Sequence, residues 1–282
     1  PREHQPTDEI KDLPGGEDSY RLFRELLARG KSEAFRAGPV LRLYHAWPPV
    51  EHERRDGEAA VAVFFWEESL IPAEIIERFN RGYDGIIVTT WFVKKALIDN
   101  GCTVPIELTP FPHELHGGNE VQEPARRGDR GFIEFLHVSS CFARKGPEAL
   151  LRAFNEVALQ LPQVRLTIKT FENPHLEIRD QVARFIDPTV ADRVRLLIAD
   201  LSDTQMAELY RSADALVLPT RGEGLNMPVI EGAYFRLPVI ATGYTGQADF
   251  LTPDTGWSVD FDFEPSRSHL GRDGSLWCEP RH

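Results

Sequence analysis

Short apolar segments alternate along the chain with longer segments in which apolar residues recur every three or four positions. The run from Ala215 to Leu218 is apolar throughout, which is typical of a strand buried on both faces of a sheet. The segment from Pro147 to Leu161 has helical spacing and begins with proline, a residue favoured in the first turn of a helix. Repeated alternation of this kind predicts an α/β fold with parallel sheets covered by helices on both faces.

The same reasoning assigns most of the chain. Strands are expected over residues 40–47, 59–66, 85–90, 105–111, 132–138, 164–170, 194–200, 215–218, 238–242 and 257–261. Helices are expected over residues 18–28, 72–80, 91–100, 147–161, 176–186, 204–213 and 228–236. Asp203 is expected to cap the helix that follows it, because an aspartate oxygen accepts hydrogen bonds from the free N–H groups of a first turn.

One region interrupts this pattern. Residues 113–131 contain four glycines, one proline and many charges, and they show no periodicity, which is typical of a linker between domains. We therefore predict an N-terminal domain over residues 1–113, a linker over residues 114–131 and a C-terminal domain over residues 132–282. A chain of 282 residues has about the length of two domains.

The amino-acid composition argues against some partners and locations of the protein and favours others. The net charge is −12, so we expect no nucleic-acid partner, because an acidic surface repels phosphate backbones. Three cysteines without a CxxC motif favour reduced thiols and a cytoplasmic location. The longest apolar run covers residues 59–66, far shorter than the roughly 20 residues of a membrane span. Peripheral membrane contact stays open.

The segment of residues 221–232 carries the main candidate chemistry. Glu223 lies in a glycine-containing loop after an apolar strand, and Glu231 lies eight residues later in the predicted helix. If Pro228 is the first helical residue, Glu231 points roughly 150° away from the apolar helix face and is free to meet a ligand. Carboxylates accept hydrogen bonds from pairs of hydroxyl groups such as those of sugars and ribose.

A second candidate is the cationic start of the long helix at Arg144 and Lys145. A helix N-terminus already carries partial positive charge, so two cations there are unfavourable unless an anion binds between them. A diphosphate fits that requirement.

Together these segments resemble the glutamate-x7-glutamate and lysine–glycine motifs of retaining glycosyltransferases of family 4. The resemblance implies the GT-B architecture, in which two Rossmann-like domains with parallel sheets face an interdomain cleft. It covers residues 132–262 well and residues 41–113 loosely. The N-terminal domain is then short or partial, because only about 112 residues precede the linker.

The resemblance also implies residue roles. Glu231 holds the ribose of the nucleotide, Glu223 faces the donor sugar, and Lys145 and Arg144 hold the diphosphate. Backbone amides of residues 224–226 assist, and Thr245 belongs to a threonine–glycine loop near the donor. The donor-binding set is therefore Arg144, Lys145, Glu223, Gly224, Leu225, Asn226, Glu231 and Thr245, and the catalytic set is Glu223, Lys145 and His45. His45, Glu67 and Glu68 follow N-terminal strands and face the acceptor or the donor sugar.

This sequence departs from the family pattern where Ser139 and Ser140 stand in the region of a further arginine. The family needs no metal, so we expect no metal site and no cofactor. Asp260 and Asp262 match a metal-binding DxD pattern, but they lie after the glutamate pair, so we assign them no metal.

The expected function is transfer of a sugar, with retention of configuration, from a UDP- or GDP-sugar to an acceptor. The acceptor class stays open among carbohydrates, lipid-linked molecules and small molecules. Two alternatives also stay open. The first is a non-catalytic member of the fold that binds sugar nucleotides or acts as a scaffold. The second is another enzyme class on this fold, such as a sugar-nucleotide epimerase.

Overall fold

The computed structural model describes residues 40–51, 56–110, 130–172, 177–267 and 274–281, together with the helical residues Arg21 and Glu25. The helix expected over residues 18–28 and the linker expected over residues 114–131 lie almost entirely outside these residues. The domain boundaries therefore stay a prediction.

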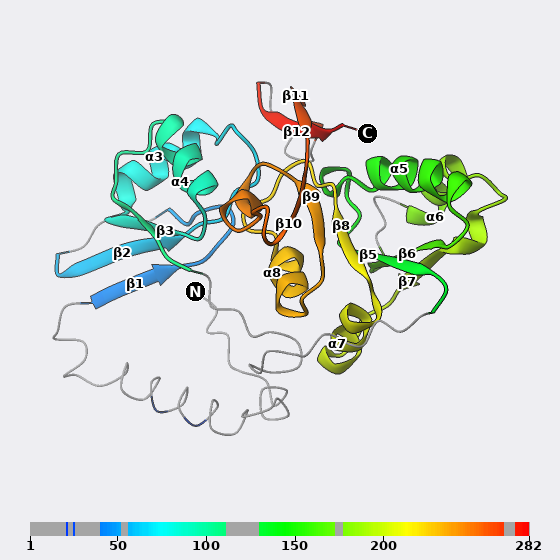
Figure 1. Cartoon of the computed structure of the whole chain (residues 1–282). Helices are drawn as coiled ribbons and strands as arrows, with labels where there is room; N and C mark the ends of the chain where they lie inside the picture. The colour runs from blue at the N-terminus through cyan, green and yellow to red at the C-terminus, as the bar shows by residue number, and fades with distance from the viewer. Residues whose placement is uncertain are drawn as a thin grey trace.

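The strands of the described residues form two parallel sheets and one antiparallel hairpin (Figure 1). The first sheet has the order β1-β2-β3-β4, and the second has the order β10-β9-β8-β5-β6-β7. The first sheet consists of β1 (Val40–Tyr44), β2 (Glu58–Val63), β3 (Gly85–Val88) and β4 (Ile106–Leu108). The second consists of β5 (Ile133–Val138), β6 (Val164–Thr170), β7 (Val194–Ile198), β8 (Ala215–Leu218), β9 (Val239–Thr242) and β10 (Gly256–Val259). The hairpin pairs β11 (Phe261–Pro265) with β12 (Leu276–Pro280).

Helices connect the strands as the alternation predicts. The helices are α3 (Ala73–Gly82), α4 (Trp91–Asp99), α5 (Pro147–Gln160), α6 (Ile178–Phe185), α7 (Asp203–Ser212) and α8 (Met227–Tyr234). In the second sheet, α5 and α6 cover one face, whereas α7 and α8 cover the other (Figure 1). Among the described residues, no helix is both long and apolar enough to cross a membrane.

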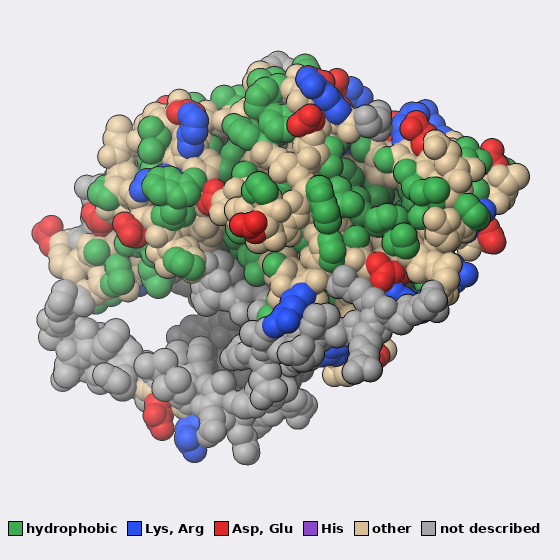
Figure 2. Space-filling view, viewed as in Figure 1, with side chains coloured by type: hydrophobic (Ala, Val, Ile, Leu, Met, Phe, Trp, Pro, Cys, Tyr) green, Lys and Arg blue, Asp and Glu red, His purple; other side chains and the backbone are tan. Residues whose placement is uncertain are grey.

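Three buried clusters correspond to these layers. The first packs α3 and α4 on the four-stranded sheet around Trp66 and Phe79. The second packs α7 and α8 on one face of the larger sheet, and the third packs α5 and α6 on its other face. A groove of about 230 Å³ lies between α5 and strands β8, β9 and β10, where hydrophobic side chains gather at the surface (Figure 2).

Some expected boundaries are wrong. The first strand ends at Tyr44 rather than at residue 47, and the strand expected over residues 257–261 is two elements, β10 and the start of β11. Helix α7 begins one residue earlier than expected, because Ser202 and not Asp203 is its cap. The Ser202 hydroxyl accepts from Gln205 N, and the Gln205 side chain accepts from Ser202 N in return.

The two halves of the chain touch directly. Thr90 Oγ1 donates to Gly224 O at 2.7 Å, and Trp91 N donates to Asp249 Oδ2 at 2.7 Å. The hairpin makes a further link, because Ser275 Oγ donates to Glu68 Oε2 at 2.6 Å. These contacts hold the loop after β8 against the loops that follow strands of the first sheet.

Gly146 sets the turn that leads from β5 into α5. Its φ is +69°, and a Cβ atom at this position would lie 1.9 Å from the carbonyl oxygen of Pro219. Only glycine satisfies both the backbone angle and this close approach of two backbones. The position of Arg144 and Lys145 above β8 depends on it.

We expect Gly146→Ala to lower the free energy of unfolding by about 3 kcal/mol or more, because left-handed strain and overpacking add. Gly131→Ala is the matched control, since Gly131 has a φ of +71° but no atom within 4 Å of the added Cβ. The control should cost only about 1–2 kcal/mol. Urea unfolding measures both. Equal losses in the two variants would show that the contact with Pro219 does not matter.

Candidate functional site

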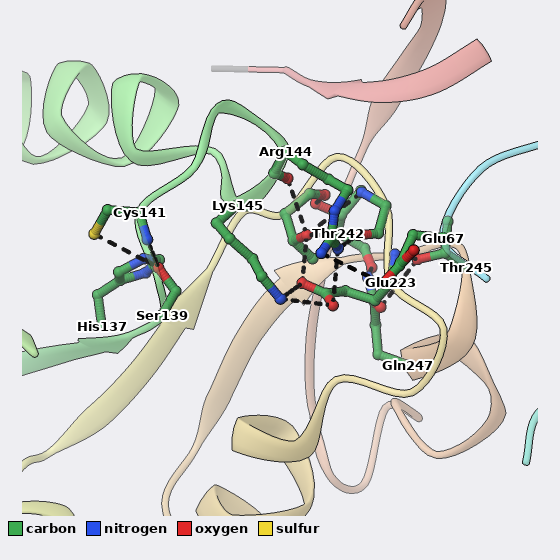
Figure 3. A network of polar contacts seen from close by, with 12 residues as sticks. Glu67, His137, Ser139, Cys141, Arg144, Lys145, Glu223, Thr242, Thr245 and Gln247 are labelled. Atoms are coloured by element: carbon green, nitrogen blue, oxygen red, sulfur yellow. Dashed lines mark hydrogen bonds and ion pairs between the residues drawn. The ribbon is translucent and has the colours of Figure 1, made fainter. Parts of the chain in front are cut away.

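The candidate site lies where neighbouring parallel strands end. Strands β5 and β8 pair, so the loops that follow them meet at the carboxyl edge of the second sheet. The first loop carries Arg144 and Lys145, and the second carries Glu223 (Figure 3). Thr220 also belongs to the second loop. This edge is where open α/β sheets bind ligands.

The centre of the site is a buried ion cluster. Glu223 is 5% exposed. Lys145 Nζ lies 2.7 Å from Glu223 Oε1 and 2.8 Å from Oε2, and Arg144 donates to Oε2 at 3.2 Å. Thr220 Oγ1 donates to Oε1 at 2.8 Å. These four contacts use the roughly four acceptor positions that a carboxylate offers.

The charge of Glu223 follows from this cluster. Burial alone would raise the pKa of its carboxyl, but the charges of Lys145 and Arg144 outweigh burial and lower the pKa below its ordinary value. Hydrogen bonds from Lys145 and Thr220 act in the same direction. Glu223 is therefore an anion at neutral pH.

Arg144 also links the two halves of the chain. It hydrogen-bonds Gly222 O, and its guanidinium lies 3.5 Å from Glu67 Oε1 in the loop after β2. The glycines of the motif allow this approach, because a Cβ at position 222 would lie 2.4 Å from Glu67 O. Gly224 lies in the same way against the backbone of Trp66. Glu67, which the sequence analysis places near the ligands, thus forms an ion pair with Arg144.

A cavity of about 210 Å³ lies beside the ion cluster. Polar side chains dominate its lining, which consists of His137, Val138, Ser139, Ser140, Lys145, Leu218, Thr220, Glu223, Asn226 and Pro228. Asn226 is 5% exposed, and its Nδ2 has no hydrogen-bond partner among the described residues. Buried donors in proteins are normally paired, so this amide is available to a ligand oxygen.

His137 forms the floor of the cavity as a neutral imidazole. Its Nδ1 lies 2.8 Å from Val217 O, and its Nε2 lies 2.7 Å from Ser139 Oγ. Because a carbonyl only accepts, Nδ1 carries the proton and Nε2 accepts from the serine. Burial lowers the pKa of His137 to about 4.

The loop after β9 supports Glu223 from its other side. Glu223 N donates to Thr245 Oγ1 at 3.2 Å, and Gly246 N donates to Glu223 O at 2.8 Å. Thr245 has φ +66° and ψ −157°, a region that non-glycine residues rarely adopt. Thr245, expected to bind the donor, contacts the backbone of the glutamate that lines the cavity, and its role toward the donor stays a prediction.

The expected orientation of Glu231 is wrong. Pro228 is the second residue of α8 rather than the first, and Glu231 is 6% exposed and accepts a hydrogen bond from Tyr210 Oη. Helix α7 packs beside α8, so the helix face that a single helical wheel leaves open is covered by Tyr210. Burial and the charge of Glu231 raise the pKa of Tyr210, so Tyr210 is the donor in this pair.

The other predicted residues lie apart from the cavity lining. His45 is exposed in the loop after β1, with its ring 5.6 Å from that of Phe65. Gly224 and Leu225 lie in the loop before α8, where Leu225 is buried. Asp262 of the DxD segment pairs with Arg281. Among the described residues, no group of three or more His, Cys, Asp or Glu side chains could hold a metal.

Three residues of the site were not predicted. Thr220 and His137 line the cavity, and Arg221 binds Glu279 of β12 and stacks at 5.0 Å on Trp277. A polar residue two positions after an apolar strand was a usable signal for Thr220. A histidine within a strand offered no such signal for His137, because the same pattern also fits a structural residue.

Comparison with known proteins places this site in context. Residues 133–264 match the family described as Glycosyl transferases group 1. Sulfoquinovosyl transferase SQD2 of Arabidopsis thaliana is 25% identical over 236 residues, which cover 80% of this chain and 42% of that protein. The serotype-specific mannosyltransferase WbdA of Escherichia coli is 30% identical over 106 residues, which cover 38% of this chain and 13% of that protein. The chain thus spans less than half the length of these relatives.

Solved structures agree in fold. Sucrose-phosphate synthase from Thermosynechococcus elongatus superposes with a TM-score of 0.59 at 17% identity, covering 85% of this chain and 64% of that one. Anabaena HepE in complex with UDP and glucose superposes with a TM-score of 0.58 at 16% identity, covering 72% and 58%. The α/β fold with two parallel sheets is that of GT-B glycosyltransferases, and residues 133–264 resemble the glycosyl transferases group 1 family.

We expect stability to fall as the pH drops from about 6.5 to 4 because of His137. The unfolded imidazole has a pKa near 6.5, so in this range the unfolded chain binds a proton that the folded chain, with a pKa of about 4, does not. The loss amounts to about 3 kcal/mol at pH 4 and is absent at pH 7.

Urea unfolding at pH 7, 5.5 and 4.5 measures this dependence. His137→Gln removes the titrating group, so its unfolding free energy should change less with pH than that of the parent. His45→Gln changes an exposed histidine and should leave the parent dependence in place. A His137→Gln variant with the full pH dependence would contradict the assignment.

Proposed function

We propose that the chain is part of a glycosyltransferase that moves a sugar from a nucleotide-diphosphate-sugar donor to an acceptor with retention of configuration. The observation that carries this proposal is the pairing of Lys145 and Arg144 with Glu223 beside a polar cavity at the carboxyl edge of the second sheet. The family match over residues 133–264 supports it. The HepE complex with UDP and glucose supports a UDP-sugar, and a GDP-sugar stays the other choice.

The cations suit a departing diphosphate. An ammonium has three donors, and Glu223 takes two of those of Lys145, so one remains for a phosphate oxygen. The N-terminal turn of α5 begins directly after these cations and adds the partial positive charge of its free N–H groups. Fixed positive charge of this kind stabilises the negative charge that develops on a leaving nucleoside diphosphate.

Glu223 has a different task before and after the donor binds. Its acceptor positions are occupied by Lys145, Arg144 and Thr220. When a diphosphate draws one cation toward itself, an acceptor position on the carboxylate becomes available to a hydroxyl of the donor sugar. Glu223 therefore holds the cations in position and then contacts the sugar. Asn226 Nδ2 supplies a further donor from the cavity wall.

Glu231 is proposed as the ribose contact, and Tyr210 takes part because it hydrogen-bonds the same carboxylate. His45 and Glu68 are proposed to face the acceptor side. Catalysis is proposed to need no metal and no cofactor. The acceptor is a carbohydrate, a lipid-linked molecule or a small molecule, and a cytoplasmic location stays a prediction from the sequence.

A thermal-shift panel of UDP, GDP, ADP, TDP and their sugars, with and without EDTA, tests the donor site directly. A ligand at 100 times its Kd adds about 2.7 kcal/mol of stability, so an EDTA-resistant rise in Tm with one nucleotide is expected. Incubation with the matching sugar nucleotide should then release the nucleoside diphosphate. Binding without release, or conversion of the sugar without an acceptor, would favour the scaffold or the epimerase instead.

We expect Lys145→Gln to weaken nucleoside diphosphate binding by about ten- to a hundredfold, because a charge-assisted hydrogen bond is worth about 1.5–3 kcal/mol. Glu223→Gln should lower turnover more than affinity. Lys95→Gln is the control, since Lys95 is an exposed lysine paired with Asp99 in α4. Calorimetric titration and product analysis measure these effects. An unchanged affinity in Lys145→Gln would remove the diphosphate assignment.

A further inference from the structure

A second cavity lies at the opposite edge of the same sheet. It measures about 570 Å³, within the range of pockets that hold small molecules. It is lined where β5, β6 and β7 begin, by Phe132, Arg165 and Val194, whereas the candidate donor cavity lies where β5 ends. Residues of α7 and of the turn that precedes β7 complete its lining.

The sheet face inside this cavity is unusual for a parallel sheet. In β6, Val164, Leu166 and Ile168 point into the core formed with α5 and α6. The alternate residues Arg165 and Thr167 therefore point to the opposite face. Parallel sheets are normally apolar on both faces, and these two polar positions depart from that pattern. Arg165 is exposed, whereas Thr167 is buried beside Glu134.

Four arginines contribute to the lining of this cavity. Arg130, Arg165, Arg193 and Arg195 line the cavity, although the whole chain has a net charge of −12. Arg130 is engaged by Asp214 at 2.8 Å, and Arg193 donates to Ala158 O at 2.7 Å. Arg165 and Arg195 form no ion pair with any of the described residues.

The ring of Phe132 holds Arg165 in place. The guanidinium carbon of Arg165 lies 4.0 Å from the ring centroid, and that of Arg130 lies 5.2 Å from it. Stacking on an aromatic ring leaves the N–H donors at the edge of a guanidinium available. The planar set of N–H donors on an arginine that forms no ion pair suits the oxygens of a phosphate.

The floor of the cavity has the opposite character. Glu134 and Thr167 lie there, and Thr167 Oγ1 donates to Glu134 Oε1 at 2.7 Å. A carboxylate has about four acceptor positions, so Glu134 retains capacity for hydroxyl donors. Asp192 adds a second acidic side chain to the lining. These carboxylates would repel an anion that has no hydroxyl groups. A ligand with both an anionic group and hydroxyls can bind the arginines with the first and the acidic floor with the second.

We propose that this cavity binds a small phosphorylated polyol, with its phosphate between Arg165 and Arg195 and a hydroxyl donating to Glu134. The ligand is either a free sugar phosphate or the headgroup of a phospholipid, since both carry the same chemistry. The cavity is separate from the candidate donor site and does not depend on the proposed transfer activity.

Calorimetric titration of the full chain with glucose 6-phosphate and with inorganic phosphate tests the proposal. Glucose 6-phosphate should bind saturably and more tightly than inorganic phosphate. The double variant Arg165→Gln, Arg195→Gln should weaken glucose 6-phosphate binding by at least about tenfold, because it loses charge-assisted contacts. The double variant Arg152→Gln, Arg184→Gln removes the same charge from exposed positions of α5 and α6 and should have no such effect.

Glu134→Ala tests the floor. It should weaken glucose 6-phosphate binding but strengthen inorganic phosphate binding, because it removes a hydroxyl acceptor and a like charge together. Lys145→Gln should leave binding unchanged, which separates this cavity from the donor site. Sedimentation with phosphatidylglycerol vesicles, compared with phosphatidylcholine vesicles, identifies the source. Vesicle binding that requires Arg165 and Arg195 assigns the lipid headgroup.

Two results would overturn the proposal. The first is the absence of saturable binding of both glucose 6-phosphate and phosphatidylglycerol vesicles. The second is an equal loss of binding in the two double variants, which would reveal a general effect of charge. Thermal unfolding of each variant verifies that it is folded, which is expected because Arg165 and Arg195 are exposed.

Discussion

The site is organised by one buried carboxylate held between two cations. Removing a charge from water costs several kcal/mol, and Glu223 is stable in its position only because Lys145, Arg144 and Thr220 surround it. Each partner comes from a loop that follows a strand of the same sheet edge. Arg144 extends the cluster to Glu67, so the charge balance also ties the larger sheet to the smaller one. The positions of these loops, of the cavity beside them and of the contact between the two halves therefore all depend on the charge balance of this cluster.

The same cluster depends on backbones that approach closely. Side-chain atoms at positions 146, 222, 224 and 246 would each lie within 3 Å of a neighbouring carbonyl oxygen. The glycines of the loop after β8 are thus required by packing against Trp66 and Glu67, beside any role in ligand binding. The glycine-containing loop after β8, which the sequence predicts to bind a ligand, therefore also forms the contact between the two sheets.

The larger sheet presents different chemistry at its two edges. At the carboxyl ends of the strands, Lys145 and Arg144 balance a buried acid, and a neutral His137 forms the cavity floor. At the amino ends, Arg165 and Arg195 stand without a described acidic partner above Glu134. Alternation along β6 produces this second edge, because successive residues of a strand point to opposite faces. One sheet thus carries two separate polar cavities.

Most helices and strands could be predicted from local sequence patterns. The bounds expected for β6 agree with the structure, and the helix predicted after Lys145 forms as α5, because helix and strand periodicities are local properties of neighbouring residues. The convergence of Arg144, Lys145 and Glu223 was also predictable, since a parallel sheet brings strand ends to one edge.

The contact partners of the site residues, in contrast, became known from the packing of the elements. Tyr210 covers Glu231, Glu67 reaches Arg144, and β12 pairs with β11 to bring Glu279 to Arg221. Each of these contacts joins residues that are distant in the chain. Local periodicity carries no information about them, because they arise from how whole elements pack and not from the preferences of any one segment.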